Sequence, residues 1–256
     1  MSDRNIDEPE DLDRVTPQDD RSQQLDGELP EVDPLQADDA HWDELDARDW
    51  RDDGPFDLNE VDLDADDVER LDFGSLVMTP FEDMQLQLQV DEATQQVQAA
   101  LVMHGNSALE IAVFAAPGTE SMAPEIRREM VEMTIQQGGD AQLAEGPFGT
   151  EIRRVIPLTN EEGEQMFHVS RTWFTHGPRW LLRGVVMGEA GMNEGVDGPT
   201  AVLFEFFRNL VVRRDGQARV PGDLIPMQIP QELVAQQDDM PQDGMSQGDQ
   251  PTGPTA

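Results

Sequence analysis

The segment GPRWLLRGVV, residues 177–186, sets Arg179 and Arg183 among apolar side chains in a chain with 54 acidic and 17 basic residues. An arginine in such a place can bind the carboxylate or phosphate of a ligand, because its planar guanidinium donates paired hydrogen bonds to these groups. It can equally be part of a sheet, lying against an aromatic ring and paired with one of the many carboxylates. The neighbouring residues decide between these two interpretations.

Alternation of side chains predicts that residues 165–187 form a β-hairpin with His176–Gly177 as its loop. This register pairs three sets of residues across the strands: Trp173 with Trp180, Arg171 with Leu182, and Ser170 with Arg183. On one face, which also carries Phe167 and Val169, Arg171 is expected to lie against a tryptophan ring and to find a carboxylate. We favour this structural role. The alternative is a small-anion or nucleotide site on the other face, formed by three side chains: His168, Ser170 and Arg183.

The sequence does not have the residue spacing of the other catalytic or metal-binding motifs that we considered. The run DLDADD, Asp62–Asp67, would need glycine at the sixth position of an EF-hand loop and glutamate at the twelfth, but Asp67 and Phe73 stand there. The four histidines have no ligand spacing, there is no G-x-S-x-G motif, and the chain has no cysteine. We therefore predict a non-enzymatic protein with no catalytic residue, no cofactor and no metal site.

The segment HWDELDARDWRDDGPFDL, residues 41–58, places four apolar side chains in a field of aspartates: Trp42, Leu45, Trp50 and Phe56. The first 70 residues hold 27 acids and six bases, and a segment with so much charge and so few apolar residues cannot offset its ordering entropy. We predict that residues 1–66 form a disordered acidic arm. Acidic segments with scattered aromatics can fold onto a partner, so these four residues are the expected partner-binding contacts, unless they dock on the chain's own domain.

Composition excludes several classes of partner. The net charge of −37 opposes binding to nucleic-acid phosphates and to anionic membranes, and no apolar run approaches the length of a membrane span. The first residues, MSDRNIDEPE, are not a secretory signal. We expect a cytoplasmic protein with no direct nucleic-acid or membrane binding, whose protein partner has a cationic surface or a hydrophobic groove.

The middle of the chain reads as one folded domain over residues 67–230, followed by a disordered tail over residues 231–256. Apolar alternation and helical periodicity predict these elements: strands over 84–90, 97–105, 108–117, 151–158, 165–174 and 179–187, and helices over 121–139 and 200–212, with a further strand at 70–78 and a closing extended segment at 219–230. The first helix is expected to be capped by Ser121 and to bury one stripe of side chains: Ile126, Met130, Val131, Met133 and Ile135. The order of elements indicates the α+β class, with two helices packed on an antiparallel sheet.

Several motifs carry a resemblance to a known family: VDEATQQV (90–97), FAAP (114–117), EIRREM (125–130), GPFGTEI (146–152), GPRWLLRGVVMGEA (177–190) and PGDLIPMQIP (221–230). Together they resemble an uncharacterised domain-of-unknown-function family of actinobacteria, often encoded beside a dUTPase and an OB-fold protein, over about residues 54–230. The resemblance implies a cytoplasmic bacterial protein but no activity. The strand–helix order also resembles the Mog1/PsbP-type sandwich, a fold used more for binding than for catalysis.

Two functions follow as expectations. The first is an adaptor protein whose acidic arm engages a protein partner of unknown identity. The second is the small-anion or nucleotide site on the arginine and histidine face of the hairpin.

Overall fold

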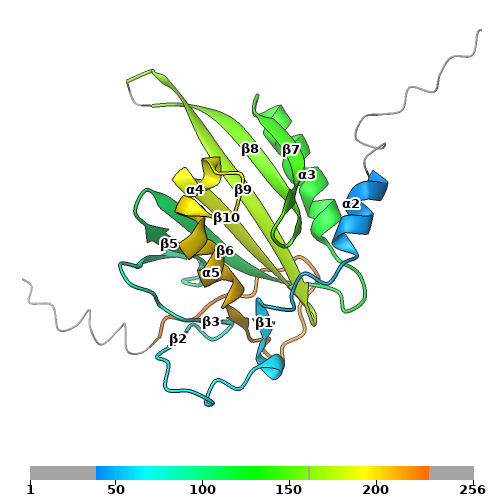
Figure 1. Ribbon diagram of the computed structural model, residues 1–256, viewed down its shortest axis with the longest axis vertical. Helices are drawn as coiled ribbons and strands as arrows, with labels where there is room; N and C mark the ends of the chain where they lie inside the picture. Colours follow the sequence, from blue (N-terminus) through cyan, green and yellow to red (C-terminus); the bar gives the residue numbers. More distant parts are fainter. Residues whose placement is uncertain (1–38, 161, 231–256) are drawn as a thin grey trace, which may run out of the picture. The chain divides into compact units, whose positions relative to one another are not determined.

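A seven-stranded antiparallel sheet is the main element of the fold, with its strands in the order β4-β5-β6-β10-β9-β8-β7 (Figure 1). The computed structural model describes residues 39–160 and 162–230. The strands of this sheet are β4 (Gln85–Val90), β5 (Val97–His104), β6 (Ser107–Ala115), β7 (Asp140–Gly146), β8 (Gly149–Thr159), β9 (Gln165–Gly177) and β10 (Trp180–Gly188).

Short strands form a second sheet, in which β1 pairs with β11 in parallel and the other neighbours are antiparallel. Its strands are β1 (Phe56–Asp57), β11 (Val211–Val212), β3 (Leu76–Met78) and β2 (Leu71–Asp72). The helices are α2 (Asp39–Asp46), α3 (Ala123–Gln136), α4 (Glu189–Met192) and α5 (Ala201–Arg208), with 3-10 turns η1 (Leu58–Glu60) and η2 (Gly198–Thr200). The predicted α+β class is confirmed.

Helices cover the two faces of the large sheet differently. On one face, α5 and the short strands enclose the larger core, which includes Trp173, Trp180 and Phe207. On the other face, α3 packs only over one end of the strands, against Ile152, Phe174 and Leu181. Figure 1 shows α4 and α5 over β9 and β10, with α3 beside β7 and β8. Much of the second face is therefore left without a helix among the described residues.

Both predicted helices exist, but each differs in detail. The second ends at Arg208, and Val211–Val212 form β11 instead of a last helical turn. In α3, the side chain of Ser121 accepts a hydrogen bond from the backbone nitrogen of Ala123 at 3.2 Å, near the expected cap. The predicted stripe is partly wrong, because Met133 and Ile135 are 55% and 57% exposed. Polar side chains are buried in α3 instead: Arg127 and Thr134.

The hairpin formed by β9 and β10 turns at Pro178–Arg179, so the predicted loop at His176–Gly177 is wrong. Arg179 adopts a positive φ of 65°, which the sequence pattern does not reveal. The two tryptophans do not face each other: Trp180 lies opposite Gly177, and Trp173 lies opposite Gly184. A β-carbon on Gly177 would come within 2.2 Å of the Trp180 ring, so glycine is required there.

The corrected register separates the other predicted pairs as well: Arg171 faces Val186, Ser170 faces Met187, and Arg183 faces Phe174. Because the register differs from the predicted one by an even number of residues, each side chain stays on the face that alternation assigned to it.

Arg171 has the structural role that we favoured. It is 2% exposed and donates two hydrogen bonds to Glu151, which is 1% exposed, at 2.9 and 2.8 Å. Its remaining donors reach the carbonyl oxygens of Asn193 and Gly195 at 2.6 and 2.7 Å, and its guanidinium lies 5.7 Å from the Trp173 ring centre. The Trp173 indole also donates a hydrogen bond to the carboxylate of Glu151, at 2.9 Å. Arg171 therefore joins β8 to β9, holds the loop at Asn193 and Gly195, and contacts Trp173 of the core.

No helix among the residues that the structure describes is long and apolar enough to cross a membrane.

We predict that Glu151→Gln lowers the free energy of unfolding by about 3 kcal/mol or more, because it leaves the buried guanidinium of Arg171 without its counter-charge. Urea unfolding followed by tryptophan fluorescence measures this loss. Glu92→Gln, in an exposed turn, is the control and is expected to change stability by less than about 0.5 kcal/mol. A loss below about 1 kcal/mol for Glu151→Gln, the size of one ordinary hydrogen bond, would contradict the role of the pair.

Candidate functional site

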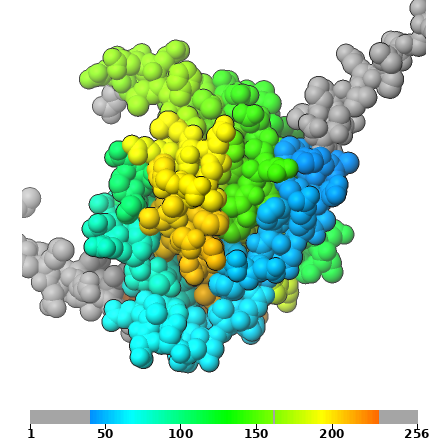
Figure 2. Space-filling model, viewed as in Figure 1, coloured from blue at the N-terminus to red at the C-terminus, as the bar shows by residue number. Residues whose placement is uncertain are grey.

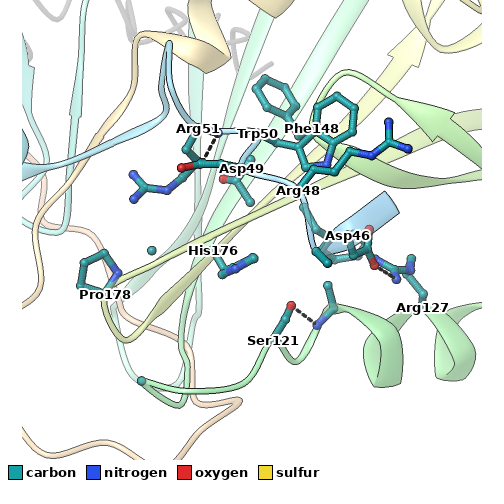
Figure 3. Close-up of a pocket in the computed structure, with 16 residues that line it drawn as sticks. Asp46, Arg48, Asp49, Trp50, Arg51, Ser121, Arg127, Phe148, His176 and Pro178 are labelled. Atoms are coloured by element: carbon teal, nitrogen blue, oxygen red, sulfur yellow. Dashed lines mark hydrogen bonds and ion pairs between the residues drawn. The ribbon is translucent and has the colours of Figure 1, made fainter. Parts of the chain in front are cut away.

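A cavity of about 620 Å³ lies between the segment after α2, the start of α3 and the end of β9. Its polar lining includes Asp46 at the end of α2 and three charged residues after it, Arg48, Asp49 and Arg51. It also includes Ser121 and Arg127 from the second element and His176 from the third. Figure 3 shows His176 between Arg51 on one side and Ser121 on the other. Cavities of this size hold small molecules in many proteins, so the charges around it decide what it can bind.

The buried arginine of this cavity is already paired. Arg127 is 4% exposed and forms a short ion pair with Asp46, whose other oxygen accepts a hydrogen bond from the backbone nitrogen of Thr150 at 3.0 Å. The carboxylate of Asp46 thus joins α2 to both α3 and β8. Asp46 therefore attaches the N-terminal segment to the rest of the domain.

Arg51 is engaged in the same way. It donates to both oxygens of Glu60 at 2.8 and 2.9 Å and to the carbonyl oxygen of Pro55 at 2.9 Å, and it lies 5.2 Å from the Trp180 ring centre. The hydrogen bonds from Arg51 lower the pKa of the Glu60 carboxyl, and the same contact raises the pKa of Arg51. Arg51 and Arg127 are therefore neutralised internally, whereas Arg48, which also lines the cavity, is exposed.

The four predicted contacts of the acidic arm lie in this folded region, which corrects the boundary predicted at residue 66. Leu45 is 1% exposed, and the Trp50 indole donates to the carbonyl oxygen of Leu45 at 2.8 Å. Trp42 is half-buried beside His41, and Phe56 is half-buried in β1, opposite Val211. Residues 1–38 of the predicted arm and the predicted tail, residues 231–256, lie outside the described residues.

Specific hydrogen bonds explain why this segment folds despite its charge. The carboxylate of Asp57 is 4% exposed and accepts a hydrogen bond from the buried indole of Trp180 at 2.9 Å. Together with the ion pair of Asp46, it gives two aspartates fixed partners in the domain. Average composition does not distinguish such aspartates from the solvated ones around them.

The predicted anion-binding residues lie on the same face of the sheet but at different positions along the strands. His168, Ser170 and Arg183 all lie on the face that α3 only partly covers. Arg183 lies nearer the turn than Ser170, donates to Glu110 at 3.0 Å, and stacks over Phe114 at 5.2 Å. The predicted trio therefore forms no single site, although its members lie on the correct side.

Sequence reasoning missed Arg154, which stands directly opposite Ser170 on the neighbouring strand β8. Alternation in EIRRVIPL indicates that Arg153 and Arg154 point to opposite faces, but only the pairing of β8 with β9 places Arg154 beside the predicted residues. Arg153 belongs to the Glu151 network, whereas Arg154 lies on the opposite face.

Exposed apolar side chains gather at the far end of the β8–β9 hairpin. We call this the hairpin end, and it consists of four residues with these exposed fractions: Val155 37%, Leu158 50%, Met166 54% and Phe167 65%. Figure 2 shows this part of the hairpin standing out from the rest of the domain at the upper edge. Alternation indicated the strands but could not show that they extend beyond the helices that cover the sheet.

Within the described residues, no group of three histidine, aspartate or glutamate side chains is arranged to hold a metal ion.

Comparisons with known proteins agree with the family-level resemblance. Residues 54–236 match the model of a family described as a protein of unknown function (DUF3710). Among solved structures, a protein of Bacteroides thetaiotaomicron VPI-5482 is similar over 58% of this chain and 48% of its own, with a TM-score of 0.35 and 14% identity. The match thus spans about half of that protein. No curated protein matches the chain.

We predict that His176 titrates below its ordinary value of 6.5. His176 is exposed, but the protein atoms around the imidazole still displace part of its hydration, which lowers its pKa first, and the nearby charge of Arg51 lowers it further. The unfolded chain then binds the proton more tightly, so this contribution to stability is present above pH 6.5 and is lost as the pH falls from 6.5 towards the folded pKa.

An NMR titration of the His176 ring measures this midpoint, and Arg51→Gln should raise it. A midpoint at or above 6.5 in the native protein would contradict this lowering of the pKa.

Proposed function

We propose, from the premise that the chain belongs to the family of proteins of unknown function DUF3710, that it is a non-enzymatic protein-binding module whose partner docks on the hairpin end. A cytoplasmic location is part of the proposal, and the lack of cysteine is compatible with it. The observation that carries the proposal is the group of four exposed apolar side chains on two adjacent strands.

The hairpin end presents apolar side chains on both of its faces. In the register of β8 and β9, Leu158 pairs with Met166, while Pro157 pairs with Phe167. Because neighbouring positions of a strand point to opposite faces, the first pair lies on one side and Phe167 lies on the other. Single exposed apolar residues are common on protein surfaces, whereas neighbouring ones favour an interaction site, and each face of the hairpin end carries two of the four. The two-sided arrangement suits insertion into an apolar groove.

Charge around the hairpin end favours a basic partner. Glu162 and Glu164 are exposed in the loop at its tip, and the whole chain carries a net charge of −37. Charges at the rim of an interface act mainly on the association rate and on the choice of partner. An apolar groove with a basic rim therefore fits this surface better than a neutral one does.

In this proposal the acidic arm does not provide the partner-binding contacts, which is the role that its composition suggested. Leu45 is buried and Trp50 is bound to it, so these side chains support the domain and are not free to anchor a partner. The buried polar groups elsewhere, such as Glu151 and Asp57, are likewise bound to structural donors. We therefore assign the anchoring contacts to the hairpin end and the steering to the net acidic charge.

We predict that Phe167→Ser and Leu158→Ser each weaken capture of the partner by roughly tenfold or more, because each removes a central apolar contact from one face of the hairpin end. Cross-linking in cells followed by affinity purification and mass spectrometry identifies the partner, and titration with the purified partner gives the affinities. Each variant should change the free energy of unfolding by no more than about 0.5 kcal/mol, since both side chains are at least half exposed.

Val220→Ser is the matched control, because Val220 is 67% exposed but lies outside the hairpin. A partner that binds both hairpin variants as tightly as the native protein and the Val220→Ser variant would overturn the proposal.

A further inference from the structure

The strand β4 forms one edge of the large sheet, because it pairs with β5 and with no other strand among the described residues. An edge strand turns half of its backbone N–H and C=O groups away from the sheet, where another strand can pair with them. The register shift between Gln89 and Val90 ends the regular part of this edge. We call the regular part, from Gln85 to Gln89, the β4 edge.

The register of β4 and β5 shows which backbone groups face outward. The loop of two residues between β5 and β6 is closed by His104 and Ser107, and the closing pair of such a loop is hydrogen-bonded. The backbone groups of His104 therefore face β6, and those of Met103, one residue earlier, face β4. Gln85 stands opposite Met103, so its backbone groups face β5. The direction then alternates along the β4 edge.

Leu86 and Leu88 consequently turn their N–H and C=O groups outward. Neither residue makes a backbone hydrogen bond on that side in the described part of the chain. Their side chains are half-buried and pack against the main core, on the face that α5 covers. The side chains of Gln85, Gln87 and Gln89 lie on the other face. A strand added here would continue both the hydrogen-bond ladder and the apolar layer of the core.

The opposite edge of the sheet, formed by β7, has protection that the β4 edge lacks. Natural edge strands carry charged residues or are covered by other elements, which prevents unwanted pairing. In β7, Asp140 and Glu145 are exposed charges, and the Oε1 atom of Glu145 lies 3.5 Å from the Nε2 atom of His41 in α2. The helix α3 also lies beside β7 (Figure 1). The β4 edge itself contains no charged residue and no proline.

Acidic side chains stand at both ends of the β4 edge. Glu82 and Asp83 precede it, and Asp91 and Glu92 follow it. If two copies of this chain paired through β4, acidic residues would face acidic residues at each end, and like charges across such a contact are destabilising. The charge therefore disfavours a second copy of this chain and favours a strand with basic residues at both ends.

We propose that the β4 edge binds an extended segment of a partner protein as an added antiparallel strand, in which alternating apolar and polar residues stand between basic ends. Backbone hydrogen bonds to Leu86 and Leu88 supply affinity, and the acidic residues at the ends select the partner. The apolar residues of the partner lie opposite these two leucines, because directly opposite residues share a face. The hairpin end lies towards the other edge of the sheet, and this inference does not rest on docking there.

Hydrogen exchange of backbone amides in the full, free chain tests the geometry first. The N–H groups of Leu86 and Leu88 should exchange freely, whereas the N–H group of Gln87, which faces β5, should be protected. Protection of the two leucine amides in the free chain would mean that another segment of this chain or a second copy already occupies the edge. That result would overturn the proposal, and sedimentation would show which of the two occupants is present.

The probe for binding is the peptide Lys-Lys-Thr-Val-Thr-Val-Thr-Lys-Lys, blocked at both ends. At saturation it should slow exchange of the Leu86 and Leu88 amides by roughly tenfold or more and leave the amides of β7 unchanged. N-methylation of both valines should abolish this effect, because it removes the donors that face β4. N-methylation of the first and last threonines is the matched control and should preserve the effect, since those N–H groups point away from the sheet.

Charge is tested by exchanging the four lysines of the peptide for glutamates, which should weaken binding roughly tenfold or more at about 0.15 M ionic strength. The double variant Glu82→Lys/Glu92→Lys should remove most of this preference, because it neutralises the acidic ends, and both side chains are exposed. Glu129→Lys/Glu132→Lys is the matched control. It makes the same change of net charge at exposed positions of α3 and should retain the preference for the lysine peptide.

Three further results would overturn the proposal: no slowing of the leucine amides by the lysine peptide, an equal effect of the two N-methylated peptides, or an unchanged preference in the Glu82→Lys/Glu92→Lys variant. None of these results bears on capture of a partner by the hairpin end, which the Phe167→Ser variant tests separately.

Discussion

The buried ion pair of Glu151 and Arg171 is the constraint on which the arrangement of this domain depends. Moving two charges from water into a core costs free energy, and their attraction offsets it only when the remaining hydrogen bonds are made as well. Here the Trp173 indole and the carbonyl oxygens of Asn193 and Gly195 make them. The pair therefore fixes β8 against β9 and holds the loop after α4. It also orients Trp173, whose ring packs against Phe148 and Phe207 in the main core.

The same kind of interaction brings the acidic N-terminal segment into the fold. Asp46 pairs with Arg127, and Asp57 accepts from Trp180, so two carboxylates of a strongly charged segment have fixed, buried partners. A buried carboxylate with its partners satisfied stabilises a particular arrangement, whereas a solvated one favours none. These two contacts, together with the buried side chain of Leu45, join the segment to the domain. Leu45 and Trp50 therefore support the structure, and the hairpin end is one group of exposed apolar side chains elsewhere in the domain.

These cases show which properties the sequence could reveal. Alternation along 165–174 and 179–187 predicts the strands and the face of each side chain correctly, because in a strand the face depends only on parity. The register depends on details that alternation does not contain: a positive φ at Arg179 and a ring that lies across Gly177. Composition averages over residues 1–66 and so hides Asp46 and Asp57. Arg154 was missed because its neighbours become known only once β8 is paired with β9.

An arginine without a carboxylate has a particular meaning in so acidic a chain. When acids outnumber arginines 54 to 17, a partner is available for nearly every guanidinium, as the pairs of Arg51, Arg127 and Arg171 show. Arg154 is a partly buried exception, because its Nε atom has no partner in the described part of the chain. Arg154 stands opposite Ser170 on the hairpin whose far end carries Leu158 and Met166 on the same face, so the pairing of β8 with β9, and not an ion pair among the described residues, fixes its position.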